Sequence, residues 1–299
     1  MKRLITLLCI AVLVFAAFTG CKKDAKSVAV GAKNFTEQYI LGNMISQLLQ
    51  ESGFKTKEQF GTGSSITRDG LTTGQISMYP EYTGTAWTVY LEHEEKVSAP
   101  QALYERVKQE DLENNGIVWL DRWDMNNTYA LAIKQERISE IGTSISDLAE
   151  YMNNNPGKLT IATDQEFYER PDGFPALAQE YGMKYEEEQI KMMDIGLSYE
   201  ALDRDQVDVA MVFATDGLLK KFNLKVLEDN EQFFPVYNVA VTIRKEVLDE
   251  FPEIEEILKP LAEIIDDETM QDLNYKVDAE GLPEKKVAVD FLKAEGLID

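Results

Sequence analysis

The chain has 299 residues, 44% of them hydrophobic, so it can bury a large core in one domain or in two lobes. Its 53 acidic residues outnumber its 30 basic residues, which gives a formal net charge of −23. Because such a surface repels phosphate backbones, we expect no nucleic acid among its partners.

The N-terminal stretch MKRLITLLCIAVLVFAAFTGC has a basic start, an apolar run from about residue 4 to residue 18, and small residues before Cys21. This pattern is typical of a secretory signal, and the apolar run is marginal for a spanning helix, so a retained membrane anchor is the alternative. The segment FTGC resembles a bacterial lipobox, with Phe18 where leucine is usual. The resemblance implies cleavage before Cys21 and lipid on its sulfur. We therefore expect a signal peptide at 1–20 and a lipid-anchored polar tether at 21–27.

Cysteine and histidine content limits the chemistry of the exported body. The two cysteines, Cys9 and Cys21, both fall in the signal region, which leaves no thiol, disulfide or cysteine metal site beyond it. The single histidine, His93, lies in the charged stretch EHEEK, where we expect it to be solvated. One histidine cannot build a histidine-rich zinc site, so we expect no metal and no cofactor.

Strand and helix signals then alternate, which predicts an α/β fold. SVAVGAK (27–33) indicates a short strand, and a helix follows with Asn34 as N-cap, Glu37 at capping-box spacing and Gly53 at its end. Lys33 and Asn34 would thus lie at the carboxyl end of a strand, where open α/β sheets bind ligands.

Further segments continue this alternation along the chain. Buried strands are expected at 117–120, 128–133, 158–163, 207–214, 224–229 and 237–243, and helices near 99–112, 144–154, 174–181 and 198–204. From Val247 the pattern predicts three helices, with Pro252, Pro260 and Pro283 at first-turn or break positions. GTGSS (61–65) lacks the Walker lysine and no GxGxxG is present, so no phosphate-binding loop is expected.

Aromatic residues gather where the chain is expected to turn or cross. MYPEYTGTAW (78–87) reads as a loop whose Tyr82, between Pro80 and Gly84, is aimed at a partner. NNTYALAIK (126–134) and FFPVYNVAVTIRK (233–245) each place a tyrosine beside a strand. If both are crossovers, residues 129–236 form one lobe, residues 28–128 and 237–299 form the other, and a ligand cleft lies between them.

Several blocks match, in order and at the usual separations, the pattern of substrate-binding lipoproteins of osmoprotectant (glycine betaine/carnitine/choline) ABC importers. They are VGAKNFTEQYILG, MYPEYTGT, NNTYALAI, RPDGFPAL, TDGLLKKFNLKVLEDNEQFFPVYN and VAVDFLKAEGLI, between Val28 and Ile298. This resemblance implies a type II periplasmic-binding-protein fold, with two α/β lobes joined by two crossovers around a ligand cleft. It implies a non-enzymatic receptor at the extracytoplasmic face of the cell membrane that serves an ABC permease with a cytoplasmic ATPase. We expect the receptor to be a monomer.

The osmoprotectants that such receptors bind carry a quaternary ammonium group, which accounts for the aromatic residues. This group has no N–H donor, and aromatic faces recognise it, each contributing ~0.5–2 kcal/mol. The resemblance places these walls at Tyr82, Tyr129, Tyr237 and Phe213, where the family usually has tyrosine. It places donors for a ligand carboxylate at Lys33, Thr85 and Arg170. Tyr79 and Trp87 are expected in the core.

Alternatives stay open at this point. The first reading is a receptor for glycine betaine, carnitine or related betaines, and the second is a receptor for choline or another amine without a carboxylate. A reading of another class is a secreted hydrolase that uses an acidic pair such as Glu81 and Asp216. We expect betaines to bind more tightly than choline, because choline would leave Arg170 without an anionic partner and no acidic acceptor is expected near position 85.

Overall fold

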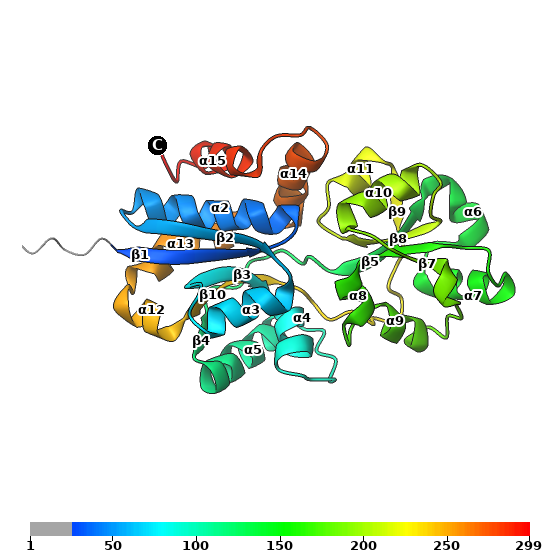
Figure 1. Cartoon of the computed structure of the whole chain (residues 1–299), viewed down its shortest axis with the longest axis horizontal. Helices are drawn as coiled ribbons and strands as arrows, with labels where there is room; N and C mark the ends of the chain where they lie inside the picture. The colour runs from blue at the N-terminus through cyan, green and yellow to red at the C-terminus, as the bar shows by residue number, and fades with distance from the viewer. Residues whose placement is uncertain (1–25) are drawn as a thin grey trace, which may run out of the picture.

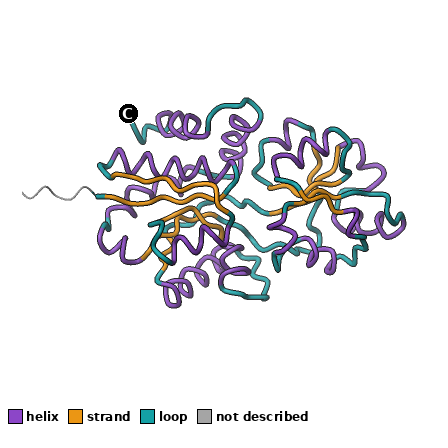
Figure 2. Tube along the Cα trace, in the orientation of Figure 1, coloured by secondary structure: helices purple, strands orange, loops and turns teal. Residues whose placement is uncertain are grey.

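The computed structural model describes residues 26–299, which form two α/β bodies side by side (Figure 1). The predicted signal peptide, Cys21 and most of the predicted tether lie outside the described residues. In the part of the chain that the structure describes there are two sheets, and each has five strands. Helices cover both faces of each sheet, as Figure 2 shows.

The first sheet has the strand order β2-β1-β3-β10-β4. Strand β1 pairs in parallel with β2 and β3, whereas β10 pairs antiparallel with β3 and β4. The strands are β1 (Ser27–Lys33), β2 (Lys55–Thr62), β3 (Met78–Tyr82), β4 (Ile117–Trp119) and β10 (Val239–Arg244). Its helices are α2 (Thr36–Glu51), α3 (Ser64–Thr72), α4 (Thr83–Thr85), a π-helical turn (Ala86–Tyr90), α5 (Pro100–Asn115), α12 (Lys245–Glu250), α13 (Glu253–Ile264), α14 (Asp267–Asp278) and α15 (Glu284–Ala294).

The second sheet has the order β7-β6-β8-β5-β9. Strand β6 runs parallel to β7 and β8, and β5 pairs antiparallel with β8 and β9. The strands are β5 (Tyr129–Lys134), β6 (Ile161–Thr163), β7 (Ile190–Met192), β8 (Val209–Phe213) and β9 (Leu224–Val226). The helices are α6 (Ile138–Ile141), α7 (Ile145–Asn154), α8 (Gln165–Glu169), α9 (Phe174–Glu180), α10 (Ile195–Asp203) and α11 (Leu218–Lys221), with 3₁₀ turns at Gln135–Arg137 and Glu187–Gln189.

The predicted α/β class is therefore confirmed, and each of the seven predicted strands is present, whereas β2, β3 and β7 were not among them. Two connections join the bodies, and they run beside each other, since Asn126 and Asn238 form an antiparallel bridge. The Asn127 N–H donates to the Tyr237 carbonyl at 3.2 Å, and the Tyr237 N–H donates to Asn126 Oδ1 at 2.7 Å. The segments that enter and leave the second body are thus fixed to each other where they pass the space between the sheets.

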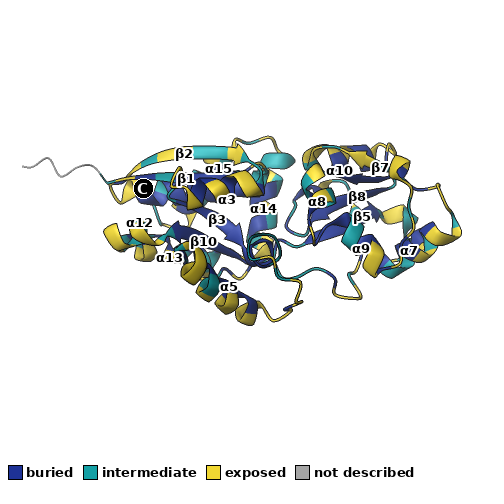
Figure 3. Cartoon of the chain, turned by 60° about the horizontal axis from the view of Figure 1, so that its bottom comes forward, coloured by how far each residue is buried: buried dark blue, intermediate teal, exposed yellow. Residues whose placement is uncertain are grey.

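Burial follows the layers (Figure 3), with dark strands inside and exposed outer helix faces. One hydrophobic cluster includes Val30 of β1, Trp123 beside the crossover, and Leu131 and Met211 of the second sheet. Because apolar burial contributes roughly 25 cal/mol per Å², this shared cluster stabilises each body and also their junction. Tyr79 and Trp87 are buried, as predicted.

The start of α2 differs from the prediction. The helix begins at Thr36, and its N-cap is Phe35, which makes no side-chain capping bond. The predicted capping box of Asn34 and Glu37 is wrong, because the Glu37 side chain turns into the protein, where it is only 2% exposed and accepts bonds from other segments.

MYPEY was interpreted as a loop, and this interpretation is wrong, since it forms strand β3 with Tyr82 as its last residue. Proline has no N–H to donate to a neighbouring strand, and it is tolerated at position 80 because β1 pairs with β3 at Met78. The Pro80 carbonyl accepts a hydrogen bond from Gln38 Nε2 at 2.9 Å. The chain turns directly after Tyr82, in α4.

Two further expectations need correction. The His93 side chain is partly solvated, at 35% exposed, but it is also held in place: its ring stacks on Trp87 with centroids 3.7 Å apart, and it bonds Glu110 at 2.8 Å. The C-terminal region has α12 to α15 in place of three helices, and Pro260 lies inside α13. Burial of Leu258 and Leu261 on either side of Pro260 offsets the hydrogen bond that it cannot donate.

Candidate functional site

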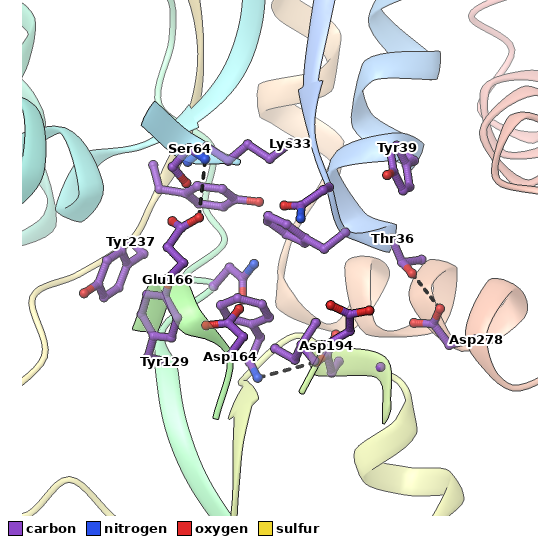
Figure 4. A pocket seen from close by; sticks show the side chains of 18 of the residues that line it. Lys33, Thr36, Tyr39, Ser64, Tyr129, Asp164, Glu166, Asp194, Tyr237 and Asp278 are labelled. Carbon is purple, nitrogen blue, oxygen red and sulfur yellow. Dashed lines mark hydrogen bonds between the residues drawn. The ribbon is translucent and has the colours of Figure 1, made fainter. Parts of the chain in front are cut away.

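A cavity of about 450 Å³ lies between the two bodies (Figure 4). Both sheets contribute to its wall, and so do the crossovers and α14. All of the residues predicted for the site line it except Arg170, which is buried next to it. The lining includes Lys33, Phe35, Thr36, Tyr39, Ser64, Tyr82, Thr85, Asn127, Tyr129, Asp164, Glu166, Asp194, Tyr199, Phe213, Asp216, Tyr237 and Asp278.

Tyr129 is the centre of the aromatic part of the wall. It faces Phe213 because the antiparallel register of β5 and β8 places these two residues opposite each other, with ring centroids 5.0 Å apart. Tyr237, on the returning crossover, meets the Tyr129 ring edge-on at 5.5 Å. Phe167 of α8 stacks on Tyr129 at 4.7 Å. The fold therefore joins three of the four predicted cage rings, with Phe213 and Tyr237 each in contact with Tyr129.

Tyr82 reaches this group through a residue that we did not predict. Phe35 stacks on Tyr82 at 6.2 Å and on Phe213 at 5.2 Å, so its ring joins the wall of the first body to that of the second. Phe35 follows Lys33 by two positions, in the loop after β1. The rule that ligands bind at the carboxyl ends of strands already marked this loop, and it was the signal available in the sequence.

Two of the predicted cage tyrosines donate hydrogen bonds from their hydroxyls to buried carboxylates. The Tyr82 hydroxyl donates to Glu37 Oε1 at 2.7 Å, and the Tyr237 hydroxyl donates to Asp172 Oδ2 at 2.5 Å. Burial raises the pKa of both phenols well above the usual range, so both stay protonated. Donation to an anion shifts electron density toward the ring, which makes its face a better partner for a cation.

Lys33 lies at the cavity wall, but its charge is balanced. Its ammonium is 2.5 Å from Glu81 Oε1 and 5.0 Å from the centre of the Tyr82 ring. Glu81 is 0% exposed and also accepts from Tyr79 at 2.6 Å and Tyr90 at 3.0 Å. Glu81 is not among the lining residues, so the structure gives no Glu81–Asp216 pair facing the cavity.

Arg170 also has a partner, which corrects the premise of the predicted ligand preference. Its Nε donates to Asp172 Oδ1 at 2.7 Å and its Nη2 to Oδ2 at 2.6 Å, while its guanidinium lies 5.1 Å from the centre of the Tyr129 ring. Burial opposes ionisation of Asp172, yet the facing Arg170 holds the pKa of this carboxyl below its ordinary value. Choline would therefore not leave Arg170 without an anion.

The opposite side of the guanidinium lies beside two residues of the cavity wall. Its Nη1 is 3.5 Å from Thr85 Oγ1 and 3.4 Å from Glu166 Oε1, both at the long limit for a hydrogen bond. The expectation that no acidic acceptor lies near position 85 is thus also wrong. Glu166 supplies one from the second body, and the Ser64 N–H of the first body donates to its Oε2 at 3.3 Å.

Residues 26–299 contain no group of three or more His, Cys, Asp or Glu side chains that could hold a metal ion. Over the same residues, no helix combines the length and the apolar character that a membrane span requires.

Comparisons with known proteins show which family this chain resembles. A family model described as the substrate binding domain of ABC-type glycine betaine transport system matches residues 26–294. A glycine-betaine-binding protein of Pseudomonas aeruginosa is 42% identical over 305 aligned positions, which cover 100% of this chain and 97% of that protein. The ergothioneine transport permease/ergothioneine binding protein EgtU of Helicobacter pylori is 36% identical over 279 positions, covering 92% of this chain and 48% of that protein.

Among solved structures, one of a glycine betaine/carnitine/choline ABC transporter superposes with a TM-score of 0.74 at 29% identity. The match covers 91% of this chain and 100% of that one. The predicted periplasmic-binding-protein fold is confirmed by this agreement together with the two mixed sheets described above.

Proposed function

We propose, from the premise that this chain belongs to the family of substrate-binding domains of ABC-type glycine betaine transport systems, that it captures a quaternary ammonium osmoprotectant. As a substrate-binding protein it makes and breaks no bond, so its function is affinity and delivery. The ligand class is glycine betaine, carnitine or a related betaine, and choline is the alternative within the class.

The observation that carries this proposal is the convergence of rings from both bodies on one cavity. Phe35 and Tyr82 come from the first body, Tyr129 and Phe213 from the second, and Tyr237 from the crossover. A trimethylammonium group among such faces gains a contribution from each, which a single carboxylate cannot match in specificity. Tyr129 contacts Tyr237, and Phe213 contacts Phe35, so we expect these rings to part when a cation enters between them.

We further propose that the lobes are residues 28–128 with 237–299 and residues 129–236, and that they close on the ligand about the paired crossovers. The bridge between Asn126 and Asn238 supports a hinge at this position. Loop and element-terminal residues of this kind absorb the dihedral changes of domain closure.

Binding is tested by calorimetric titration of the exported chain, residues 22–299, with glycine betaine, carnitine, proline betaine, choline and ergothioneine. Ergothioneine belongs in the panel because a cavity of about 450 Å³ exceeds what a small betaine fills. Saturable binding with the ligand recovered intact supports the receptor. Consumption of the ligand without a permease would instead support the hydrolase, and no binding of any of the five would refute the proposal.

The partners in delivery are a permease with a cytoplasmic ATPase, and we propose that the monomeric chain is held at the extracytoplasmic face of the membrane by lipid on Cys21. The lipobox-like FTGC is the support for this anchor. Cys21→Ala should release the protein from the membrane fraction, and its retention there would contradict the anchor.

A further inference from the structure

We propose that Glu166 competes with a ligand carboxylate for the donors predicted to receive it, and that carboxylated ligands must displace Glu166. Glu166 would then be a specificity-determining residue that distinguishes betaines from choline. This inference rests on the proposed function, because it assumes that the cavity binds quaternary ammonium compounds.

The position of Glu166 is the first argument. It lies on α8 of the second body, and its carboxylate crosses the cavity to the Ser64 N–H of the first body, as Figure 4 shows beside Tyr129. Its other oxygen lies 3.4 Å from Arg170 Nη1, which in turn lies 3.5 Å from Thr85 Oγ1. A carboxylate of the protein thus stands among the groups predicted to hold the carboxylate of a ligand.

The lengths of these contacts are the second argument. At 3.3 Å to Ser64 and 3.4 Å to Arg170, the Glu166 contacts are long for hydrogen bonds, whereas the Arg170–Asp172 bonds are 2.6 and 2.7 Å. A ligand carboxylate that settled at the usual ~2.7–2.9 Å of a charge-assisted bond would be held more strongly than Glu166 is. The Glu166 side chain is 32% exposed, so it can turn toward solvent without passing through the core.

The charge balance is the third argument. Lys33 is paired with Glu81 and Arg170 with Asp172, so neither cation brings an uncompensated positive charge to the cavity. With Glu166 in place, the same donors would face two carboxylates when a betaine binds, and like charges at this separation repel. Choline avoids this conflict, since its hydroxyl can donate to Glu166 where it stands.

The test compares glycine betaine and choline as calorimetric ligands of the exported chain and of its Glu166→Gln variant, at the same pH and salt. The variant keeps the shape of the side chain and removes its charge. We expect the Kd for glycine betaine to fall about tenfold and the Kd for choline to stay within threefold or rise. Glu169→Gln is the matched control, because it removes the same charge from an exposed position of the same helix, and it should change neither Kd by more than twofold.

Glu166→Ala provides a second variant in case the amide forms new bonds, and the ratio of the two dissociation constants should shift in the same direction. Weaker glycine betaine binding in both variants, or equal gains for both ligands, would overturn the role of Glu166 while leaving the proposed function intact. If neither ligand binds the wild-type protein, the proposed function fails, and the inference fails with it.

Discussion

The hydroxyl of Tyr82 donates a 2.7 Å hydrogen bond to Oε1 of Glu37, a buried carboxylate whose partners are all neutral. The other donors are Asn127 Nδ2 at 2.8 Å, Thr215 Oγ1 at 2.6 Å and Asn274 Nδ2 at 3.4 Å. They come from the crossover, the second body and α14. Glu37 therefore ties a wall of the cavity to three other parts of the fold.

Removing this carboxylate should destabilise the protein. Glu37→Ala removes the acceptor of the buried Tyr82 and Thr215 hydroxyls and of the Asn127 amide, so we expect the free energy of unfolding to fall by about 2–4 kcal/mol. Urea denaturation measures the change. Glu51→Ala, at the exposed end of the same helix, is the control and should stay within roughly 0.5 kcal/mol of wild type. Equal losses in the two variants would show that Glu37 is not a structural centre.

The aromatic wall should act as a unit. Tyr82→Ala, Tyr129→Ala and Tyr237→Ala should each weaken glycine betaine binding about tenfold or more, since a desolvated ring contributes ~1.5–2 kcal/mol to holding a cation. Tyr104 is equally buried but bonds the Leu120 carbonyl far from the cavity lining, so Tyr104→Ala should lower the melting temperature and leave the affinity unchanged. Calorimetric titration with glycine betaine measures the affinity of each variant. Unchanged affinity in two of the three wall variants would mean that these rings pack the hydrophobic core and do not bind the ligand.

Stability should fall as the pH rises from about 4 to about 8, in part through Asp216. Burial, together with the neighbouring Asp278 and Glu37, raises the pKa of this carboxyl to about 7, although the hydrogen bonds from the Tyr199 hydroxyl and the Phe213 N–H act in the opposite direction. In the unfolded chain the group titrates near 3.8. Between these two values the folded protein holds a proton that the unfolded chain has released. The contribution of Asp216 to the free energy of unfolding is therefore complete below pH 4 and is lost as the pH rises through 7.

Asp216→Asn should flatten this dependence, because an amide cannot ionise and still accepts the Tyr199 hydroxyl. We expect the variant to lose less stability than wild type between pH 4.5 and 8, by up to about 3 kcal/mol. The stability of the variant should still depend on pH to some extent, since burial also raises the pKa of Asp164 to about 6 and that of Glu37 above its usual value. Melting curves across this range are the measurement, and parallel profiles of the two proteins would contradict the assignment.

The sequence predicted the order of the strands because apolar, β-branched runs bounded by turn residues are a local signal. Strand β1 was expected at 27–33 and lies at Ser27–Lys33. Strand β2 was missed because KTKEQFGT is polar and lies at the edge of its sheet, where little of it is buried. A strand of this kind is specified by its pairing with β1 and not by its own composition.

The site was harder to predict where contacts join distant segments. Glu37 matched a capping box by its spacing, yet its burial depends on donors from positions 127, 215 and 274. Glu166 meets Ser64 only because α8 of one body faces α3 of the other. Neither relationship has a local signature, since each exists only after the two sheets are assembled.

The last prediction concerns which ammonium compound the site prefers, and Arg170 decides it. Asp172 uses one side of its guanidinium, and on the other side Nη1 lies 3.5 Å from Thr85 Oγ1 and 3.4 Å from Glu166 Oε1. A betaine carboxylate that displaces Glu166 can take this second side, whereas choline offers an alcohol, so we still expect glycine betaine to bind more tightly than choline. Arg170→Lys keeps a cation for Asp172 but removes the planar fork that serves two partners at once. The variant should weaken glycine betaine binding roughly tenfold and choline binding less than threefold, which narrows the gap. Arg137→Lys, at an ion pair with Asp208 outside the cavity lining, controls for the substitution itself. Choline affinity equal to or above that of glycine betaine on the wild-type chain would show that the polar end of the site is not a carboxylate subsite.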